Sequence, residues 1–378
     1  MKKICGLFFA LIFMLPFNIV KANDLATNAS SVIVMEPTTG EIIYERNSHE
    51  RRHPASMTKI MTMLLVMEAI EDGLIKWEDV VTVSENASSM GGSQILLETG
   101  EQMSVYDLFK GLAVASGNDA AVALAEKIAG TEEMFVSMMN ERAKELGLQD
   151  TNFKNPHGLD DANHYSSAYD MAVMAKELVK HEKVFEFTSI YEDYLRKDTD
   201  RAFWLVNTNK LVRFYKGVDG LKTGYTSEAG FCITATAKIN DMRIITVVMG
   251  EPDSKTRNAD VTSVFDYVYA QYALNKIVDT STVLKTVSVE KGKKDSVDIV
   301  ALENVSDLYK KTEGVNEITY DIEVNNIKAP VKKGDIVGKL VLKENGLSTK
   351  TIDLTVAEDV AKANIFELYF KYLKKYLG

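Results

Sequence analysis

Pro54-Ala-Ser-Met-Thr-Lys-Ile60, Val114-Ala-Ser-Gly-Asn-Asp-Ala120 and Val218-Asp-Gly-Leu-Lys-Thr-Gly-Tyr-Thr226 are the three stretches that decide how this chain folds. The first places Ser56 three residues before Lys59, at the start of a run with helical apolar spacing. The second supplies Ser-Gly-Asn between two helical patterns, and the third supplies Lys-Thr-Gly in a β-rich run. Alone, these motifs carry little information, because chance gives Ser-x-x-Lys about once per chain of this length and Lys-Thr-Gly in about one chain in ten. Together and in this order they indicate an active-serine acyl-transfer site.

The spacing of Ser56 and Lys59 has a chemical reason. A serine hydroxyl is a weak nucleophile and needs a base beside it. In the first turn of a helix, residues i and i+3 share a face, so Lys59 can reach the Ser56 hydroxyl. Lys59 accepts a proton only when it is partly neutral, and both burial and a second cation favour that state. Lys222 is the expected second cation, and the helix N-terminus adds backbone N–H groups near Ser56.

Further segments carry a family resemblance. The chain resembles the D-alanyl-D-alanine carboxypeptidases among the low-molecular-mass penicillin-binding proteins. Besides the three stretches, the similar segments are Gly92-Ser-Gln94, Asn155-Pro-His-Gly-Leu159 and His164-Tyr-Ser-Ser-Ala-Tyr-Asp-Met-Ala172. The likeness covers nearly the whole chain, and it implies removal of the terminal D-alanine from peptidoglycan stem pentapeptides through an acyl-enzyme.

The resemblance also implies roles for single residues. Ser56 corresponds to the acylated serine and Lys59 to its general base. Ser116 and Asn118 correspond to the second motif, which relays protons and holds the substrate amide.

The third motif corresponds to the substrate-binding strand. Lys222 and Thr223 would bind the terminal carboxylate, with Gly224 and Tyr225 completing the substrate-binding strand. The backbone N–H groups of Ser56 and Tyr225 would form the oxyanion hole.

Three other functions remain as alternatives. A serine β-lactamase would share the fold, but no Glu-x-x-x-Asn segment lies between the second and third motifs. A DD-endopeptidase would share all three motifs. A non-catalytic wall-binding protein is disfavoured because Ser56, Lys59 and Lys222 are all intact.

The remaining composition excludes other classes of protein. The formal net charge is −10, which disfavours a nucleic-acid partner. The histidines show no metal-binding spacing, so no metal and no cofactor are expected, and His157 and His164 are interpreted as structural. Cys232 is the one cysteine beyond the expected signal peptide and is interpreted as a small buried hydrophobic residue.

The chain divides into four parts. Lys2 and Lys3, an apolar run and Val20-Lys-Ala22 predict a signal peptide over 1–22. A catalytic domain over 23–277 is expected to be α/β (α+β), like the serine β-lactamases and transpeptidases, with helices on an antiparallel sheet. A small all-β domain is expected over 278–357 and a terminal amphipathic helix over 358–378.

Within these parts, apolar periodicity predicts the elements. The expected helices cover 57–71, 105–112, 119–128, 167–181 and 261–274, with the first of them amphipathic. The expected hairpins join 31–35 to 41–45 and 230–237 to 242–249. The expected strands of the β domain cover 282–289, 297–301, 315–324, 335–342 and 350–356.

The last segment combines aromatic and lysine residues. From 361 to 378, a wide apolar arc that includes Ile365, Phe366, Tyr369 and Phe370 lies opposite Glu367, Lys371, Lys374 and Lys375. This pattern favours a helix in a membrane interface, with docking on the β domain or on a second copy as the alternative. The expected partners are therefore stem peptides, β-lactams as covalent inhibitors and a membrane surface, while the oligomeric state stays open. The expected location is extracytoplasmic, at the outer face of the cytoplasmic membrane.

Overall fold

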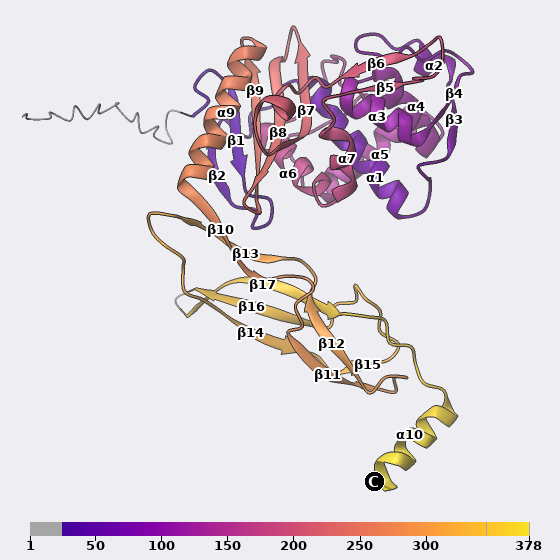
Figure 1. Ribbon diagram of the computed structural model, residues 1–378, viewed down its shortest axis with the longest axis vertical. Helices are drawn as coiled ribbons and strands as arrows, with labels where there is room; N and C mark the ends of the chain where they lie inside the picture. The colour runs from indigo at the N-terminus through magenta and orange to yellow at the C-terminus, as the bar shows by residue number, and fades with distance from the viewer. Residues whose placement is uncertain (1–24, 345, 378) are drawn as a thin grey trace, which may run out of the picture.

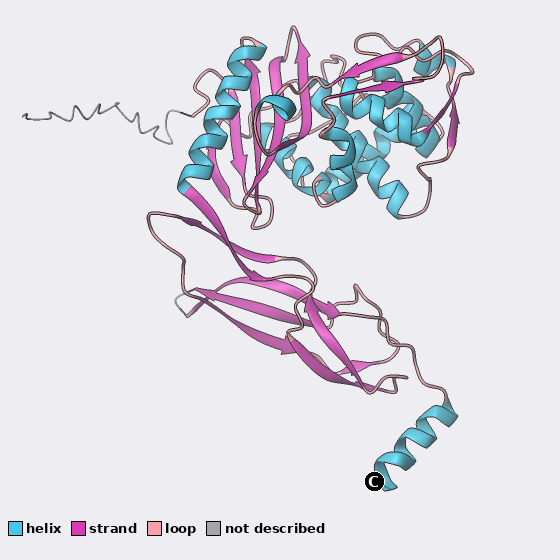
Figure 2. Cartoon of the chain, viewed as in Figure 1, coloured by secondary structure: helices cyan, strands magenta, loops and turns pink. Residues whose placement is uncertain are grey.

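The computed structural model describes residues 25–344 and 346–377, so the predicted signal peptide 1–22 lies outside the described residues. Two domains follow one another along the chain, and a terminal helix lies at the far end of the second (Figure 1). The first domain combines helices and strands, and the second consists of strands (Figure 2). The predicted fold class is confirmed.

A five-stranded antiparallel sheet forms one side of the first domain, in the order β2-β1-β9-β8-β7. Its strands are β1 (Ser31–Met35), β2 (Ile42–Arg46), β7 (Val218–Thr226), β8 (Gly230–Ile239) and β9 (Met242–Glu251). Both predicted hairpins are confirmed. The turn between β8 and β9 consists of Asn240 and Asp241, whose φ angles of 50° and 64° are typical of a type I′ hairpin turn.

The central strands β1, β9 and β8 are buried on both faces of the sheet, which explains why they are almost continuously apolar. In β1, Ile33 and Met35 belong to the core shared with the helices. Val32 and Val34 face the other core, which is closed by α9 (Ser254–Gln271). The sheet therefore lies between α9 and most of the other helices (Figure 1).

The helical part contains the helices predicted around the first two motifs. Its helices are α1 (Lys59–Glu71), α2 (Glu85–Ser88), α3 (Val105–Ala115), α4 (Asn118–Ala129), α5 (Glu132–Glu145), α6 (Ala168–Leu178), α7 (Phe185–Thr188) and α8 (Leu211–Phe214). Two short antiparallel pairs accompany them, β3 (Val80–Thr82) with β4 (Gln102–Ser104) and β5 (Glu192–Leu195) with β6 (Phe203–Val206).

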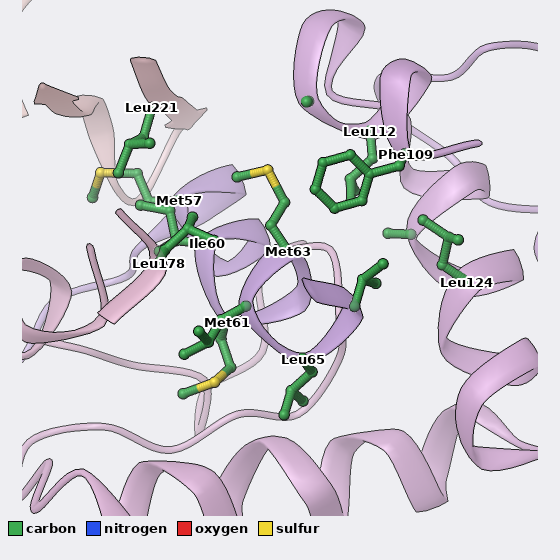
Figure 3. Close-up of a cluster of buried hydrophobic side chains, with 14 of the residues drawn as sticks. Met57, Ile60, Met61, Met63, Leu65, Phe109, Leu112, Leu124, Leu178 and Leu221 are labelled. Carbon is green, nitrogen blue, oxygen red and sulfur yellow. The ribbon is translucent and has the colours of Figure 1, made fainter. Parts of the chain in front are cut away.

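Helix α1 runs through the middle of this part and differs from expectation. Ten of its thirteen residues are buried, so it is not amphipathic. Figure 3 shows Ile60, Met61, Met63 and Leu65 pointing to different sides of the helix, with Phe109, Leu112 and Leu124 among the surrounding apolar side chains. A helix enclosed on all sides is held rigidly, which suits an element that carries functional residues at its start.

The second domain contains the predicted strands and three more. Its elements are β10 (Tyr272–Val278), β11 (Lys285–Glu290), β12 (Ser296–Ala301), β13 (Val305–Lys310), β14 (Ile318–Val324), β15 (Ile327–Lys328), β16 (Gly338–Glu344) and β17 (Leu347–Val356). A six-stranded sheet follows the order β14-β16-β17-β12-β11-β15, and β10 pairs with β13.

The helix predicted over 261–274 is wrong at its end. Helix α9 stops at Gln271, and Tyr272 to Leu274 begin β10, which pairs with β13 at Tyr272↔Lys310. The aromatic spacing fits both structures, and the long-range pairing with β13 selects the strand. The boundary expected at 277/278 lies at the far end of this strand.

Candidate active site

Ser56 and Lys59 lie on a short 3₁₀ turn that leads into α1. The turn spans Ala55–Thr58, and Lys59 is the first residue of the α-helix. In a 3₁₀ turn, residues i and i+3 are eclipsed, so the two side chains are brought together more directly than on an α-helix. Lys59 Nζ lies 3.1 Å from Ser56 Oγ.

Lys59 is completely buried, and its amine has two further partners. Nζ lies 2.6 Å from Asn118 Oδ1 and 2.6 Å from the carbonyl oxygen of His157. Burial lowers the pKa of Lys59 well below its usual value, the charge of Lys222 lowers it further, and Asp119 acts in the opposite direction. A neutral amine has two hydrogens, which these two acceptors satisfy, so its lone pair is left for the Ser56 hydroxyl.

The second motif occupies the bend between α3 and α4. Ser116 caps α3 with a left-handed backbone (φ 65°), and Gly117 precedes α4. Asn118 opens α4, and its amide is held at both ends, by Lys59 at Oδ1 and by the carbonyl of Gly91, 2.7 Å from Nδ2. The bend therefore directs Asn118 towards Lys59.

The third motif lies on β7, the edge strand of the sheet. Lys222 is buried, and its Nζ donates to the carbonyl of Thr223 at 3.0 Å. Burial, followed by the charge of Arg257, lowers the pKa of Lys222 to about 7. The Thr223 hydroxyl lies 2.8 Å from that of Thr208.

Gly224 allows β7 to approach the Ser56 turn closely. A Cβ on Gly224 would lie 2.8 Å from the carbonyl oxygen of Pro54 and 3.2 Å from the backbone nitrogen of Ser56. Only glycine fits such a distance, so the strand and the turn converge at the Ser56 amide. The next side chain, Tyr225, is exposed and packs on Phe231 with ring centroids 4.3 Å apart.

The loop around His157 contributes more than the sequence indicated. Its backbone supplies the acceptor for Lys59, while Pro156 accepts a hydrogen bond from the Thr62 hydroxyl at 2.6 Å. The Asn155-Pro-His-Gly-Leu159 segment was the available signal, but nothing in residue type shows that a main-chain carbonyl is the functional group. Arg257 and Asp119, which shift the pKa of Lys222 and Lys59, were also missed.

His164 lies behind the Ser56 turn. Its Nδ1 accepts from the backbone N–H of Lys154 at 3.1 Å, so Nε2 donates to the Thr58 hydroxyl at 2.8 Å. Burial lowers the pKa of His164 to about 4. The structural interpretation of this histidine agrees with these contacts.

Comparison with known proteins identifies the family. A family described as D-alanyl-D-alanine carboxypeptidase matches residues 18–253, and the C-terminal domain of penicillin-binding protein 5 matches residues 272–362. The chain belongs to the D-alanyl-D-alanine carboxypeptidase family. This is a family of serine peptidases, and the resemblance stated from the motifs is confirmed.

Two relatives cover most of the chain. D-alanyl-D-alanine carboxypeptidase DacF of Bacillus subtilis is 50% identical over 95% of this chain and 91% of its own length. The carboxypeptidase DacA of Haemophilus influenzae is 35% identical over 91% of this chain and 88% of its own length.

Solved structures of the family agree in fold. Penicillin-binding protein 5 of Haemophilus influenzae has a TM-score of 0.70 and 34% identity, covering 89% of this chain and 98% of its own. Penicillin-binding protein D2 of Listeria monocytogenes, solved in an ampicillin-bound form, has a TM-score of 0.57 and 30% identity, covering 64% of this chain and 96% of its own. A protein similar to this chain has therefore been solved with a β-lactam bound.

Proposed function

We propose that this protein is a serine-type D-alanyl-D-alanine carboxypeptidase that cleaves the terminal D-alanine from peptidoglycan stem pentapeptides, with Ser56 as nucleophile. One observation carries the assignment. Lys59 Nζ is buried 3.1 Å from Ser56 Oγ, while its two other partners are hydrogen-bond acceptors. A lysine with a lowered pKa in this position is a general base for the serine hydroxyl.

In acylation, Ser56 Oγ attacks the carbonyl carbon of the scissile peptide bond while its proton passes to Lys59 Nζ. The negative charge develops on the carbonyl oxygen, which faces the backbone N–H groups of Ser56 and Tyr225. The close approach of β7 to the Ser56 turn at Gly224 supports this pairing of amides.

The carbon–nitrogen bond then breaks, and the leaving D-alanine amine takes, through the Ser116 hydroxyl, the proton that Lys59 Nζ accepted from Ser56. Water hydrolyses the resulting ester by the reverse route, with Lys59 again accepting a proton. Asn118, which is fixed by Lys59 and by the Gly91 carbonyl, would hold the substrate amide.

Lys222 and Thr223 would bind the free carboxylate of the terminal D-alanine. Lys222 is buried, which disfavours its charged form. A substrate carboxylate beside it would favour the protonated amine, which would then donate a charge-assisted hydrogen bond to that carboxylate. This demand for a free C-terminal carboxylate favours a carboxypeptidase.

We further propose that the protein is exported by its N-terminal segment and lies peripherally at the outer face of the membrane through α10 (Ile365–Leu377). Five apolar or aromatic side chains in the described part of α10 are exposed, namely Ile365, Phe366, Tyr369, Phe370 and Leu373. The first four of them line one hollow on the helix surface. Among the described residues, no helix is both long and apolar enough to cross a bilayer.

Lys371 connects α10 to the β domain. Its Nζ forms an ion pair with Asp295 and donates to the carbonyl of Gly292 at 3.0 Å. The polar side of α10 therefore contacts the β domain at this residue, which leaves the apolar side free for an interface.

The intact mass of the protein after mixing with benzylpenicillin tests the assignment of Ser56. One covalent adduct, located on the peptide that contains Ser56, is expected, together with release of D-alanine from a stem pentapeptide. An adduct on any other residue would overturn the assignment.

A further inference from the structure

The segment Gly91–Leu97 lies beside the second motif and is held there by a buried carboxylate. Asp119 is 1% exposed. Its Oδ2 accepts the backbone N–H groups of Ile95 at 3.0 Å and Leu97 at 3.1 Å, and its Oδ1 accepts that of Ala120 at 2.9 Å. Several backbone N–H donors stabilise an ionised carboxylate without a cation beside it. One side chain thus joins the start of α4 to the 91–97 segment.

The other edge of the same segment is held by two arginines. Arg196 donates to the carbonyl of Ile95 at 3.1 Å, and Arg201 donates to that of Leu96 at 3.0 Å. Both guanidinium groups also bind Glu101, at 2.6 and 3.1 Å. The N–H side of the segment is therefore fixed by Asp119 and the C=O side by the arginines.

The segment in turn fixes Asn118. The Asn118 backbone N–H donates to the carbonyl of Ser93 at 2.7 Å, and its side-chain Nδ2 donates to that of Gly91 at 2.7 Å. With Nδ2 held in this way, Oδ1 is directed to Lys59. A displacement of the 91–97 segment would rotate Asn118 and remove one partner of the Lys59 amine.

We propose that Asp119 is a positioning residue for the reaction, which holds the 91–97 segment and Asn118 in place and whose negative charge keeps Lys59 a strong enough base. This inference rests on the proposed role of Lys59. It assigns to Asp119 two effects that can be separated, one of geometry and one of charge.

Charged and titratable groups surround Lys59 on several sides. Lys222 on β7 lowers the pKa of Lys59, and Asp119 on α4 raises it. Burial lowers the pKa of His157 and of His164, which lie in the loops packed against the Ser56 turn, so the neutral form of each is favoured. Glu132 on α5 lies 3.6 Å from His157 Nε2, whereas Asp119 is the carboxylate whose charge raises the pKa of Lys59 against the effect of Lys222. Without Asp119, Lys59 would be a weaker base.

The test compares the pH dependence of acylation by benzylpenicillin in Asp119→Asn and in the wild type. The asparagine removes the charge and one of the two acceptor oxygens. We expect the acidic limb of the rate profile, where Lys59 loses its proton, to move to lower pH. We also expect the maximal acylation rate to fall by ~10- to 100-fold, because the base is weaker and Asn118 is less well placed.

Asp170→Asn is the matched control. Asp170 is also a buried carboxylate, which accepts the backbone N–H of Asp150 at 2.8 Å and the hydroxyl of Thr151 at 2.7 Å. It makes no contact with the 91–97 segment, so its variant should keep the wild-type profile. An Asp119→Asn profile with an unmoved acidic limb would overturn the charge effect.

Arg196→Gln tests the geometric effect by itself. It also provides a test of the 91–97 segment if Asp119→Asn does not fold. It loosens the carbonyl edge of the 91–97 segment, so the maximal rate should fall while the acidic limb stays in place. A shift of the acidic limb in Arg196→Gln as large as that in Asp119→Asn would assign the shift to geometry and sink the proposal. A wild-type protein that forms no penicillin adduct at any pH would instead contradict the proposed function.

Discussion

Gly158 packs directly against the carbonyl of Ala55, at the entry to the turn that carries Ser56. A Cβ on Gly158 would fall far inside the van der Waals distance of the Ala55 oxygen and would also meet the Thr58 hydroxyl. The φ of Gly158 is +90° and that of Ala55 is +47°, so both segments of the chain have an unusual backbone conformation at this contact. The loop that supplies the His157 carbonyl is thereby pressed onto the Ser56 turn.

Gly158→Ala is expected to displace this loop. The clash involves backbone on both sides and cannot be relieved by a side-chain rotation, so the free energy of unfolding should fall by about 3 kcal/mol or more. Urea unfolding would measure this loss. Gly73→Ala is the control, because Gly73 also has a left-handed φ of +72° but has nothing within 4 Å of an added Cβ. It should cost only about 1–2 kcal/mol, and equal losses in both variants would contradict the close contact.

Ser56→Ala is expected to abolish the penicillin adduct, since no other group replaces the covalent step. The variant keeps the Asn118 and His157 partners of Lys59, so it should fold. Mass spectrometry after incubation with benzylpenicillin checks both the wild type and the variant. Ser89→Ala, which changes the exposed serine directly after α2, should still form the adduct. A covalent adduct on Ser56→Ala would show that the nucleophile lies elsewhere.

Lys222→Ala is expected to lose discrimination for a free carboxylate. The wild type should hydrolyse a peptide that ends in D-Ala-D-Ala far better than the same peptide amidated at its C-terminus. The variant should treat the two nearly alike. The comparison of kcat/KM for both peptides with both proteins measures this difference. Unchanged discrimination in Lys222→Ala would remove the carboxylate role from this lysine.

The free energy of unfolding is expected to fall in acid because of His164. Its folded pKa of about 4 lies below the usual value of 6.5. The unfolded chain therefore binds more protons between these values, and stability falls as the pH drops from about 6.5 to about 4, by at most ~3 kcal/mol. In His164→Gln the acid loss should be smaller, since an uncharged amide replaces the imidazole. His49→Gln, which alters a mostly exposed histidine, should retain the wild-type acid loss. Thermal melts at pH 4, 5, 6 and 7 test both.

Deletion of residues 365–378 should release the protein from vesicles that contain anionic lipid and leave hydrolysis of a soluble peptide unchanged. The cut is placed after Asn364, so that the shortened chain keeps Lys362, which pairs with Gly292, and Ala363, which donates to the carbonyl of Lys291. The apolar side of α10 is expected to resist salt, whereas its lysines contribute a part that salt weakens. Equal sedimentation of both proteins with vesicles would favour docking or dimerisation through α10.

The limits of the sequence are visible at α9 and β10. The apolar spacing over 261–274 fits a helix, yet Tyr272 to Leu274 form a strand because β13 pairs with them. In the same way, spacing predicted that α1 has one apolar side, although helices on several sides bury it. The spacing of apolar residues in the sequence indicates which residues prefer apolar surroundings. It does not indicate on how many sides other elements pack against a helix or strand.

The sequence by itself determined the three motifs, their order and the pairing of Ser56 with Lys59, because residues three apart on a helical turn meet whatever surrounds them. Only the tertiary structure decided which main-chain groups complete the site. The His157 carbonyl, the Gly91 carbonyl and the amides held by Asp119 come from loops far apart in the chain, and the backbone of any residue carries the same donor and acceptor. The folded chain alone brings these identical groups to within hydrogen-bond distance of Lys59, Asn118 and Asp119.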